Sequence, residues 1–330
     1  MHRSSLVIVS PALKAANNGN WQTARRWREL LGATHRVRIT DRWPDAALPT
    51  DDVMLALHAA RSADAIAAWA GRHGSAGLGV VLTGTDLYGG LDRDPAVLHS
   101  LERASRLVVL QDQALAALPA LLRNKARTIY QSTPARQPLP KTAHQLRIAV
   151  VGHLREVKSP QTVFALARQL GARPDVRIDH AGGADAGWAA QARQAEADSA
   201  CYRWLGPLSH GAARRLIQRA HLLLHPSAAE GGAHVVMEAV RSGTPVLASR
   251  IPGNVGMLGP DYEGYFAQAD AAGLAELVLR CRREQQPGQD PDTGLLARLR
   301  AQCGRRAGLF DPDTERAALL QLVQELQDTR

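Results

Sequence analysis

The chain has 330 residues, of which 45% are hydrophobic and 22% are charged, and its formal net charge at pH 7 is +9. This composition excludes a disordered chain, and the length suits two domains better than one. No apolar run approaches the length of a bilayer span, which excludes stable membrane insertion.

The three cysteines, Cys201, Cys281 and Cys303, are far apart in the sequence. They show no metal-ligand spacing and no even disulfide set, and the apolar segment 6–9 is too short for a signal peptide, so we expect a cytoplasmic protein. The positive charge favours anionic ligands, although an arginine excess also arises from base composition alone. Because the arginines are spread out and only 4% of residues are aromatic, we expect no nucleic-acid partner.

The first half of the chain predicts buried strands, each followed by a polar loop or a helix. A hydrophobic run at 6–10 precedes an asparagine-rich loop and a helical stretch at 21–31. Further strands are predicted at 36–39, 51–58, 78–82, 107–110 and 126–130. This alternation favours a parallel α/β sheet, in which functional groups gather at the carboxyl ends of strands.

A proline-rich segment separates this series from a second one. Pro134, Pro138 and Pro140 lie within a short polar run, which is typical of a linker between domains. The apolar stretch 146–151 then starts a new strand that closes on Gly152. Two Rossmann-like halves joined by a linker predict a cleft lined by strand ends.

The second half is organised around residues 222–249, which predict a strand, a loop, a helix, a turn and another strand. Gly231 and Gly232 place backbone N–H groups at the start of the helix, where the helix dipole favours phosphate. Glu230 lies in the loop and Glu238 lies on the helix, and their carboxylates can accept hydrogen bonds from sugar hydroxyls. The alternative is a Gly-rich turn flanked by two solvated glutamates.

Glu230, Glu238 and the Ser-Gly-Thr-Pro-Val turn at 242–246 resemble the donor-site signature of the family-4 glycosyltransferases, which have the GT-B fold. The resemblance implies that Glu230 faces the transferred sugar and that Glu238 holds the ribose of the nucleotide. It also implies that the backbone amides after Glu230, up to that of Ala233, hold the diphosphate.

A second segment, GHLREVKSP at 152–160, resembles the diphosphate-binding segment of the same family. Lys158 matches the family's lysine, whereas His153 replaces its arginine, whose fixed charge and forked donors a neutral imidazole lacks. Arg155 could compensate for that loss. Gly206 and Leu208 match the segment whose backbone contacts the nucleotide base, and residues 251–256 predict a further loop near the donor.

The remaining motifs concern the ends of the chain. In GT-B enzymes the loop after the first strand approaches the reacting centre, which makes Lys14, Asn17, Asn18, Gly19 and Asn20 candidates. The three aspartate pairs at 92–94, 290–292 and 311–313 are interpreted as turns or caps, so we expect no metal and no cofactor. Residues 311–330 predict a capped helix, which in such enzymes crosses back onto the first domain.

Four segments narrow the resemblance: NNGNWQTARRW at 17–27, LHAARSADAI at 57–66, LTGTDLY at 82–88, and 152–160. Together they are similar to the bacterial selenosugar synthases of selenoneine biosynthesis. This implies that selenophosphate attacks the anomeric carbon of UDP-N-acetylglucosamine, that UDP leaves, and that phosphate is then lost by hydrolysis. Because selenium is already nucleophilic, no catalytic base is assigned. An anionic acceptor favours a cationic pocket, and the candidates are Lys14, Asn20, His58, Arg61, His153 and Arg155.

The sequence therefore predicts an α/β protein with the GT-B fold, two Rossmann-like doubly wound domains that face each other across a cleft. We expect an acceptor domain over 1–140, a donor domain over 145–310 and a C-terminal helix over 311–330. Two alternatives remain, an ordinary family-4 enzyme with a lipid, glycan or small-molecule acceptor, and a non-catalytic basic binding protein. The residues alone do not define the nucleotide base, the sugar, or whether the anomeric configuration is retained or inverted.

Overall fold

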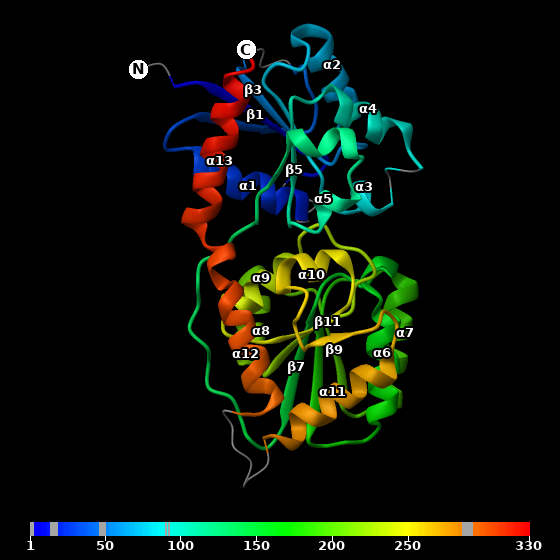
Figure 1. The fold of residues 1–330 in the computed structure, drawn as a ribbon. Coiled ribbons are helices and arrows are strands. Elements are labelled where there is room, and N and C mark those ends of the chain that lie inside the picture. Colours follow the sequence, from blue (N-terminus) through cyan, green and yellow to red (C-terminus); the bar gives the residue numbers. More distant parts are fainter. Residues whose placement is uncertain (1–2, 14–18, 46–50, 90, 92, 286–292) are drawn as a thin grey trace. The chain divides into compact units, whose positions relative to one another are not determined.

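The computed structural model describes residues 3–13, 19–45, 51–89, 91, 93–285 and 293–330. The chain divides into two compact α/β units, which Figure 1 draws in sequence colours. Unit 1 comprises Met1–Ser132, Glu230–Gly232 and Leu309–Arg330, and unit 2 comprises Thr133–Ala229 and Ala233–Gly308.

Unit 1 is built on a six-stranded parallel sheet with the order β2-β1-β3-β4-β5-β6. Its strands are β1 (Ser5–Val9), β2 (Arg36–Thr40), β3 (Val53–Leu57), β4 (Leu78–Val81), β5 (Arg106–Val109) and β6 (Ala126–Thr128). Its helices are α1 (Gly19–Leu31), α2 (Ala63–His73), α3 (Thr85–Tyr88), α4 (Pro95–Arg103), α5 (Ala114–Ala117) and α13 (Pro312–Gln327).

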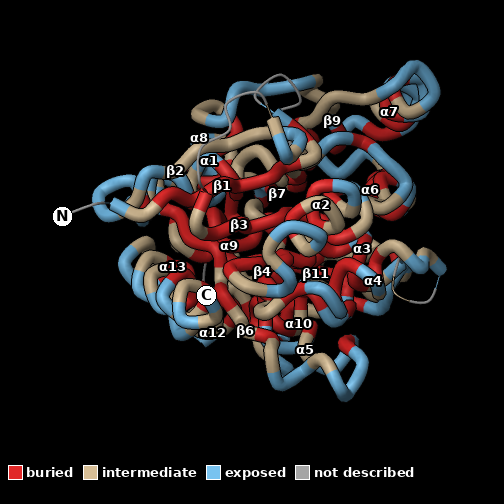
Figure 2. Tube along the Cα trace, turned by 90° about the horizontal axis from the view of Figure 1, so that it is seen from above, coloured by how far each residue is buried: buried red, intermediate tan, exposed pale blue. Residues whose placement is uncertain are grey.

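Strand β1 shows why both faces of this sheet are covered. Successive side chains of a strand point to opposite faces, so an uninterrupted apolar strand must be buried on both. Val7 and Val9 lie in a core cluster with residues of α2 and α4. Leu6 and Ile8 lie in a second cluster with residues of α1 and α13. The buried strands appear red in Figure 2.

The C-terminal helix α13 completes the second of these clusters. Leu319, Leu322 and Leu326 are buried there together with Trp27 of α1. The Asp311 side chain caps α13 by accepting a hydrogen bond from the N–H of Asp313. Asp94 caps α4 in the same way, which confirms the predicted capping role of these two aspartate motifs. The third, at 290–292, lies outside the described residues.

Unit 2 contains a second parallel sheet with the order β12-β11-β10-β7-β8-β9. Its strands are β7 (Leu146–Val151), β8 (Val176–Ala181), β9 (Tyr202–Gly206), β10 (Leu222–His225), β11 (Val246–Ser249) and β12 (Tyr265–Phe266). Its helices are α6 (Pro160–Leu170), α7 (Ala186–Asp198), α8 (His210–Arg219), α9 (His234–Val240), α10 (Pro252–Leu258), α11 (Ala271–Arg283) and α12 (Leu295–Arg306).

The structure corrects the prediction of a loop at 251–256. Pro252 occupies the first turn of α10, where a residue without an N–H group is tolerated. The Nδ2 of Asn254 donates to the carbonyl of Ser249 over 2.9 Å, which ties the helix to the end of β11. Within the described ranges, no helix is both long and apolar enough to span a bilayer.

Candidate functional site

The strand order of each sheet reverses at one point. Parallel α/β sheets bind ligands beside the carboxyl ends of strands at such a point, because the connections leave it in opposite directions. In unit 2 the reversal lies between β7 and β10, and in unit 1 it lies between β1 and β3. The predicted residues Lys158 and His58 follow β7 and β3, so both come from strands at a reversal point.

In unit 2, hydrogen bonds join the loops that follow neighbouring strands. The N–H of Leu154 donates to the carbonyl of Gly183 over 2.8 Å, and the N–H of Ala228 donates to that of Val157 over 2.9 Å. The loops after β7, β8 and β10 are therefore fixed relative to one another. A Cβ atom on Gly182 would lie only 1.8 Å from the carbonyl oxygen of Gly152, so this packing requires a glycine.

This loop set carries three of the predicted anion-binding side chains. His153 and Arg155 are exposed, and Lys158 is half-buried in the short 3₁₀ turn Glu156–Lys158. The side chain of Arg155 forms no ion pair with any described residue, so its charge is available to a ligand. Two cationic side chains, those of Lys158 and Arg155, and the exposed imidazole of His153 thus follow β7.

Glu238 is buried on α9 and contacts two basic side chains of α8. Its Oε1 lies 2.6 Å from Nε2 of His210 and 3.7 Å from Nη1 of Arg214. Arg214 is 2% exposed, and its burial lowers the pKa of the guanidinium, while the charge of Glu238 opposes that shift. The other carboxylate oxygen, Oε2, accepts no hydrogen bond from the part of the chain that the structure describes.

The helix that follows the glycine-rich loop is α9, which begins at His234. Its N-cap is Ala233, whose N–H donates to the Sδ of Met257 over 3.1 Å, so this amide already contacts a weak acceptor. Gly231 and Gly232 precede the cap and group with unit 1. There Gly231 is buried, and a Cβ on it would lie 2.5 Å from the carbonyl of Thr83. The expected bare amides at a helix start are therefore covered by protein at Gly231 and Ala233.

The other residues that were predicted to bind the donor are Gly206, Leu208 and Glu230. Gly206 ends β9 with a φ of 67°, which favours glycine, and its carbonyl accepts from the N–H of Gly182 over 2.9 Å. Leu208 is exposed in the loop before α8. Glu230 is half-buried and groups with unit 1.

In unit 1, His58 has an unusual backbone conformation. Its φ is 68°, a strained value for a residue with a side chain, and such strain is common at functional sites. Its Nε2 lies 3.1 Å from Oγ1 of Thr85. Burial lowers the pKa of His58, although nearby Asp86 opposes the shift, so the imidazole is neutral at pH 7. His58 can therefore serve an anion as a hydrogen-bonding group and adds no charge.

Asp86 supports this region through its buried carboxylate. Oδ1 accepts from the N–H groups of Thr83 and Gly84, both over 2.9 Å, and Oδ2 accepts from that of Ala59 over 3.0 Å. These bonds connect the ends of β3 and β4. Arg61 is exposed nearby and forms no ion pair with a described residue, which leaves its charge available to a ligand.

The loop after β1 is described only in part. Gly19 is exposed at the start of α1, where its carbonyl accepts a hydrogen bond from Oγ1 of Thr23 over 2.9 Å, and Asn20 is half-buried. The predicted candidates Lys14, Asn17 and Asn18 lie outside the described residues.

Sequence reasoning missed His210 and Arg214. Arg214 lies in an amphipathic helical stretch with Arg215 and Arg219, and nothing in the pattern distinguishes the buried arginine from its exposed neighbours. His210 follows Ser209, the N-cap of α8, which places it at the start of the helix. The Ser-His pair after the predicted base-binding segment was a usable signal for a helix start, but gave no sign of Glu238 as a partner.

The described residues contain one further cavity, which lies away from the predicted site residues. A pocket of about 560 Å³ lies between β12 and α11, lined among others by Tyr265, Asp270 and Arg280, and it includes none of the predicted site residues. No three His, Cys, Asp or Glu side chains in the described ranges group in a way that could hold a metal ion.

Residues 131–290 match the family described as glycosyl transferases group 1. The matched segment contains Lys158, Glu230 and Glu238, the residues on which the resemblance to the donor site rests. The match supports assignment to a glycosyltransferase family. A comparison with curated protein sequences finds no significant match to this chain.

Solved structures resemble the chain over nearly its whole length. Sucrose-phosphate synthase from Thermosynechococcus elongatus is 18% identical with a TM-score of 0.76, and the match covers 98% of each chain. HepE from Anabaena, in complex with UDP and glucose, is 15% identical with a TM-score of 0.69 over 98% of this chain and 100% of that one. The two parallel-sheet, Rossmann-like units match GT-B glycosyltransferase structures, so the predicted fold is confirmed.

Proposed function

We propose that this chain is a glycosyltransferase that takes its sugar from UDP-N-acetylglucosamine and joins it to selenophosphate. The observation that carries the first part is the family match over 131–290, which includes Lys158 and Glu238. It is supported by the structural resemblance to HepE, which was solved with UDP and with UDP-glucose. The sugar and the selenium acceptor rest on the four segments that resemble selenosugar synthases.

The positions of those segments support the finer proposal. The described parts of these segments, residues 19–27, 57–66, 82–88 and 152–160, lie at or after the ends of β1, β3, β4 and β7. Ligand contacts in parallel α/β folds come from such strand ends, whereas core packing comes from the strands themselves. The resemblance is therefore concentrated where a substrate would be contacted.

The proposed reaction assigns a role to each group. Lys158 and Arg155 neutralise the diphosphate of the donor, and Oε2 of Glu238 accepts a hydrogen bond from the ribose. The selenium of selenophosphate attacks the anomeric carbon as the bond from that carbon to the β-phosphate oxygen breaks, and UDP leaves. Water then cleaves the phosphorus–selenium bond, which releases phosphate and the selenosugar. Arg61 and neutral His58 bind the phosphate part of the acceptor.

The test is a UDP-release assay with UDP-N-acetylglucosamine as donor. We expect selenophosphate to stimulate release strongly and glycerol to have little effect, with the selenosugar product identified by mass spectrometry. Glu238→Ala should weaken UDP binding, and Arg61→Ala should leave UDP binding unchanged while reducing turnover.

Other outcomes distinguish the alternatives. Equal stimulation by an alcohol or a glycan would leave the glycosyltransferase proposal intact and remove selenophosphate as the acceptor. A chain that binds no nucleotide and releases no UDP would instead favour a non-catalytic binding protein.

A further inference from the structure

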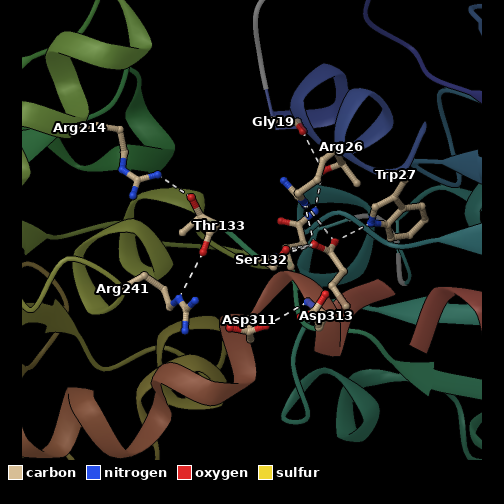
Figure 3. A network of polar contacts seen from close by, with 12 residues as sticks. Gly19, Arg26, Trp27, Ser132, Thr133, Arg214, Arg241, Asp311 and Asp313 are labelled. Carbon is tan, nitrogen blue, oxygen red and sulfur yellow. Dashed lines mark hydrogen bonds and ion pairs between the residues drawn. The ribbon is translucent and has the colours of Figure 1, made fainter. Parts of the chain in front are cut away.

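The segment that leaves unit 1 is anchored within unit 2 by two arginines, of which Arg214 is buried and Arg241 is half-buried. The chain passes from unit 1 to unit 2 between Ser132 and Thr133. Nη1 of Arg214 donates to Oγ1 of Thr133 over 2.5 Å, and its Nη2 donates to the carbonyl of Pro134 over 3.2 Å. Nε of Arg241 donates to the carbonyl of Thr133 over 3.2 Å, and both arginines point at this residue in Figure 3.

The same Nη1 of Arg214 also lies 3.7 Å from Oε1 of Glu238. Since the Arg214 side chain is 2% exposed, it cannot satisfy its charge through water and depends on these partners. Its Nε has no hydrogen-bond partner among the described residues, so the two terminal nitrogens alone hold it in place. The guanidinium of Arg214 therefore contacts both the linker, at Thr133, and the carboxylate of Glu238, which is proposed to bind the ribose.

We infer that Arg214 is a positioning residue that couples the linker at Thr133 to ribose recognition by Glu238. The inference rests on the proposed donor role of Glu238 and adds a dependence that this role alone does not contain. When Thr133 accepts from Nη1, the guanidinium is held where its charge orients Oε1 of Glu238, and Oε2 remains directed at the ligand. When Thr133 moves away, Arg214 loses this restraint, and Oε1 of Glu238 keeps only its contact with His210 among the described residues.

The test compares UDP with 2′-deoxy-UDP by isothermal titration calorimetry, because the ratio of the two Kd values reports the ribose contact itself. A hydrogen bond to a charged group predicts that the unmodified chain prefers UDP by about tenfold. Thr133→Val removes the acceptor at nearly constant volume, and we expect the preference to fall to about threefold. Arg214→Lys, which cannot form the same fork, should lower it similarly. Thr142→Val, a second linker threonine that does not contact Arg214, is the matched control and should keep the full preference.

The outcomes separate the inference from the proposal beneath it. Full preference in Thr133→Val would overturn the coupling and leave the donor role of Glu238 intact. If the unmodified chain binds both nucleotides equally, the ribose role of Glu238 is wrong and the coupling falls with it. Loss of affinity for both nucleotides by the same factor in Thr133→Val would show a merely structural effect and would also overturn the inference.

Discussion

The indole Nε1 of Trp27 donates a 2.7 Å hydrogen bond to Oε1 of Glu315, a residue 288 positions later in the sequence. The Glu315 side chain is fully buried within unit 1, and its Oε2 also accepts from Nε of Arg26 over 2.8 Å and from the N–H of Ser132 over 2.7 Å. Figure 3 shows these donors converging on one carboxylate. The side chain of Glu315, which lies on α13, thus joins this helix to α1 and to Ser132, the last residue before the chain enters unit 2.

We expect Glu315→Gln to destabilise unit 1 by roughly 3 kcal/mol, because it removes the buried carboxylate charge that pairs with Arg26 and turns an amide donor towards existing donors. Urea denaturation measured by circular dichroism gives the free energy of unfolding. The control is Glu29→Gln on the exposed face of α1. Among the described residues the Glu29 carboxylate pairs only with exposed Arg25, so this variant should change the free energy of unfolding by less than about 0.5 kcal/mol. Equal effects of the two variants would contradict the role of the buried carboxylate.

Two neighbouring glycines in unit 2, Gly182 and Gly152, should differ in how much their replacement by alanine lowers stability. A Cβ on Gly182 would overlap the Gly152 carbonyl, whereas a Cβ on Gly152 meets no atom within 4 Å. Gly182→Ala should therefore cost about 2 kcal/mol and displace the loop that carries His153, and Gly152→Ala should be close to neutral. Thermal denaturation and UDP titration of both variants measure these effects. Similar losses in both would show that the loop packing is not the cause.

The neutral, strained His58 should matter for the acceptor and not for the donor. Asparagine tolerates a positive φ but is too short to reach Thr85, so His58→Asn should fold and lose the contact. We expect kcat/KM for selenophosphate to fall about tenfold, equivalent to about 1.4 kcal/mol, with the Kd for UDP unchanged. A parallel loss of UDP affinity would contradict the assignment of His58 to the acceptor.

Acid should destabilise the fold through buried His180. Its Nδ1 lies 3.0 Å from the hydroxyl of Tyr202, and burial lowers the pKa of His180 from 6.5 to about 3. Between these values the unfolded chain binds a proton that the folded chain does not, so stability falls as pH decreases from about 6.5 towards 3. From pH 7 to 5 this residue should account for a loss of about 2 kcal/mol.

His180→Asn should lower stability at pH 7 and flatten the pH dependence between pH 7 and 5. Denaturant titrations at several pH values measure both effects. The exposed His144 offers a matched control, and His144→Asn should leave the slope as it is. An unchanged slope in His180→Asn would assign the acid sensitivity to other groups.

Local patterns predicted the elements well because the parallel strands are continuous apolar runs. The strand at 146–151 agrees with β7, and the predicted C-terminal helix contains α13. The loop predicted at 251–256 is wrong because proline and two glycines resemble a turn, whereas Pro252 in fact starts a helix. Local spacing cannot distinguish these two uses of proline.

The candidate site was predictable only where a motif is continuous in sequence. Lys158 and Glu238 come from short motifs, and they lie on the segments that follow β7 and β10 of one sheet. Arg214 and Glu315 derive their importance from partners 81 and 289 positions away. In the sequence, Arg214 lies in an amphipathic helical stretch and Glu315 lies in the first turn of a capped helix. Charged residues at such positions are usually exposed to solvent, so the burial of these two could not be inferred from sequence.

The place of α13 in unit 1 has a consequence for synthesis. While the ribosome translates the middle of the chain, Leu6, Ile8 and Leu55 lack the helix that later covers them, because Leu319, Leu322 and Leu326 of that helix have not yet been made. The first half of the polypeptide therefore keeps part of an apolar sheet face uncovered until α13 has been translated. We therefore expect nascent unit 1 to bind chaperones that recognise exposed hydrophobic surfaces.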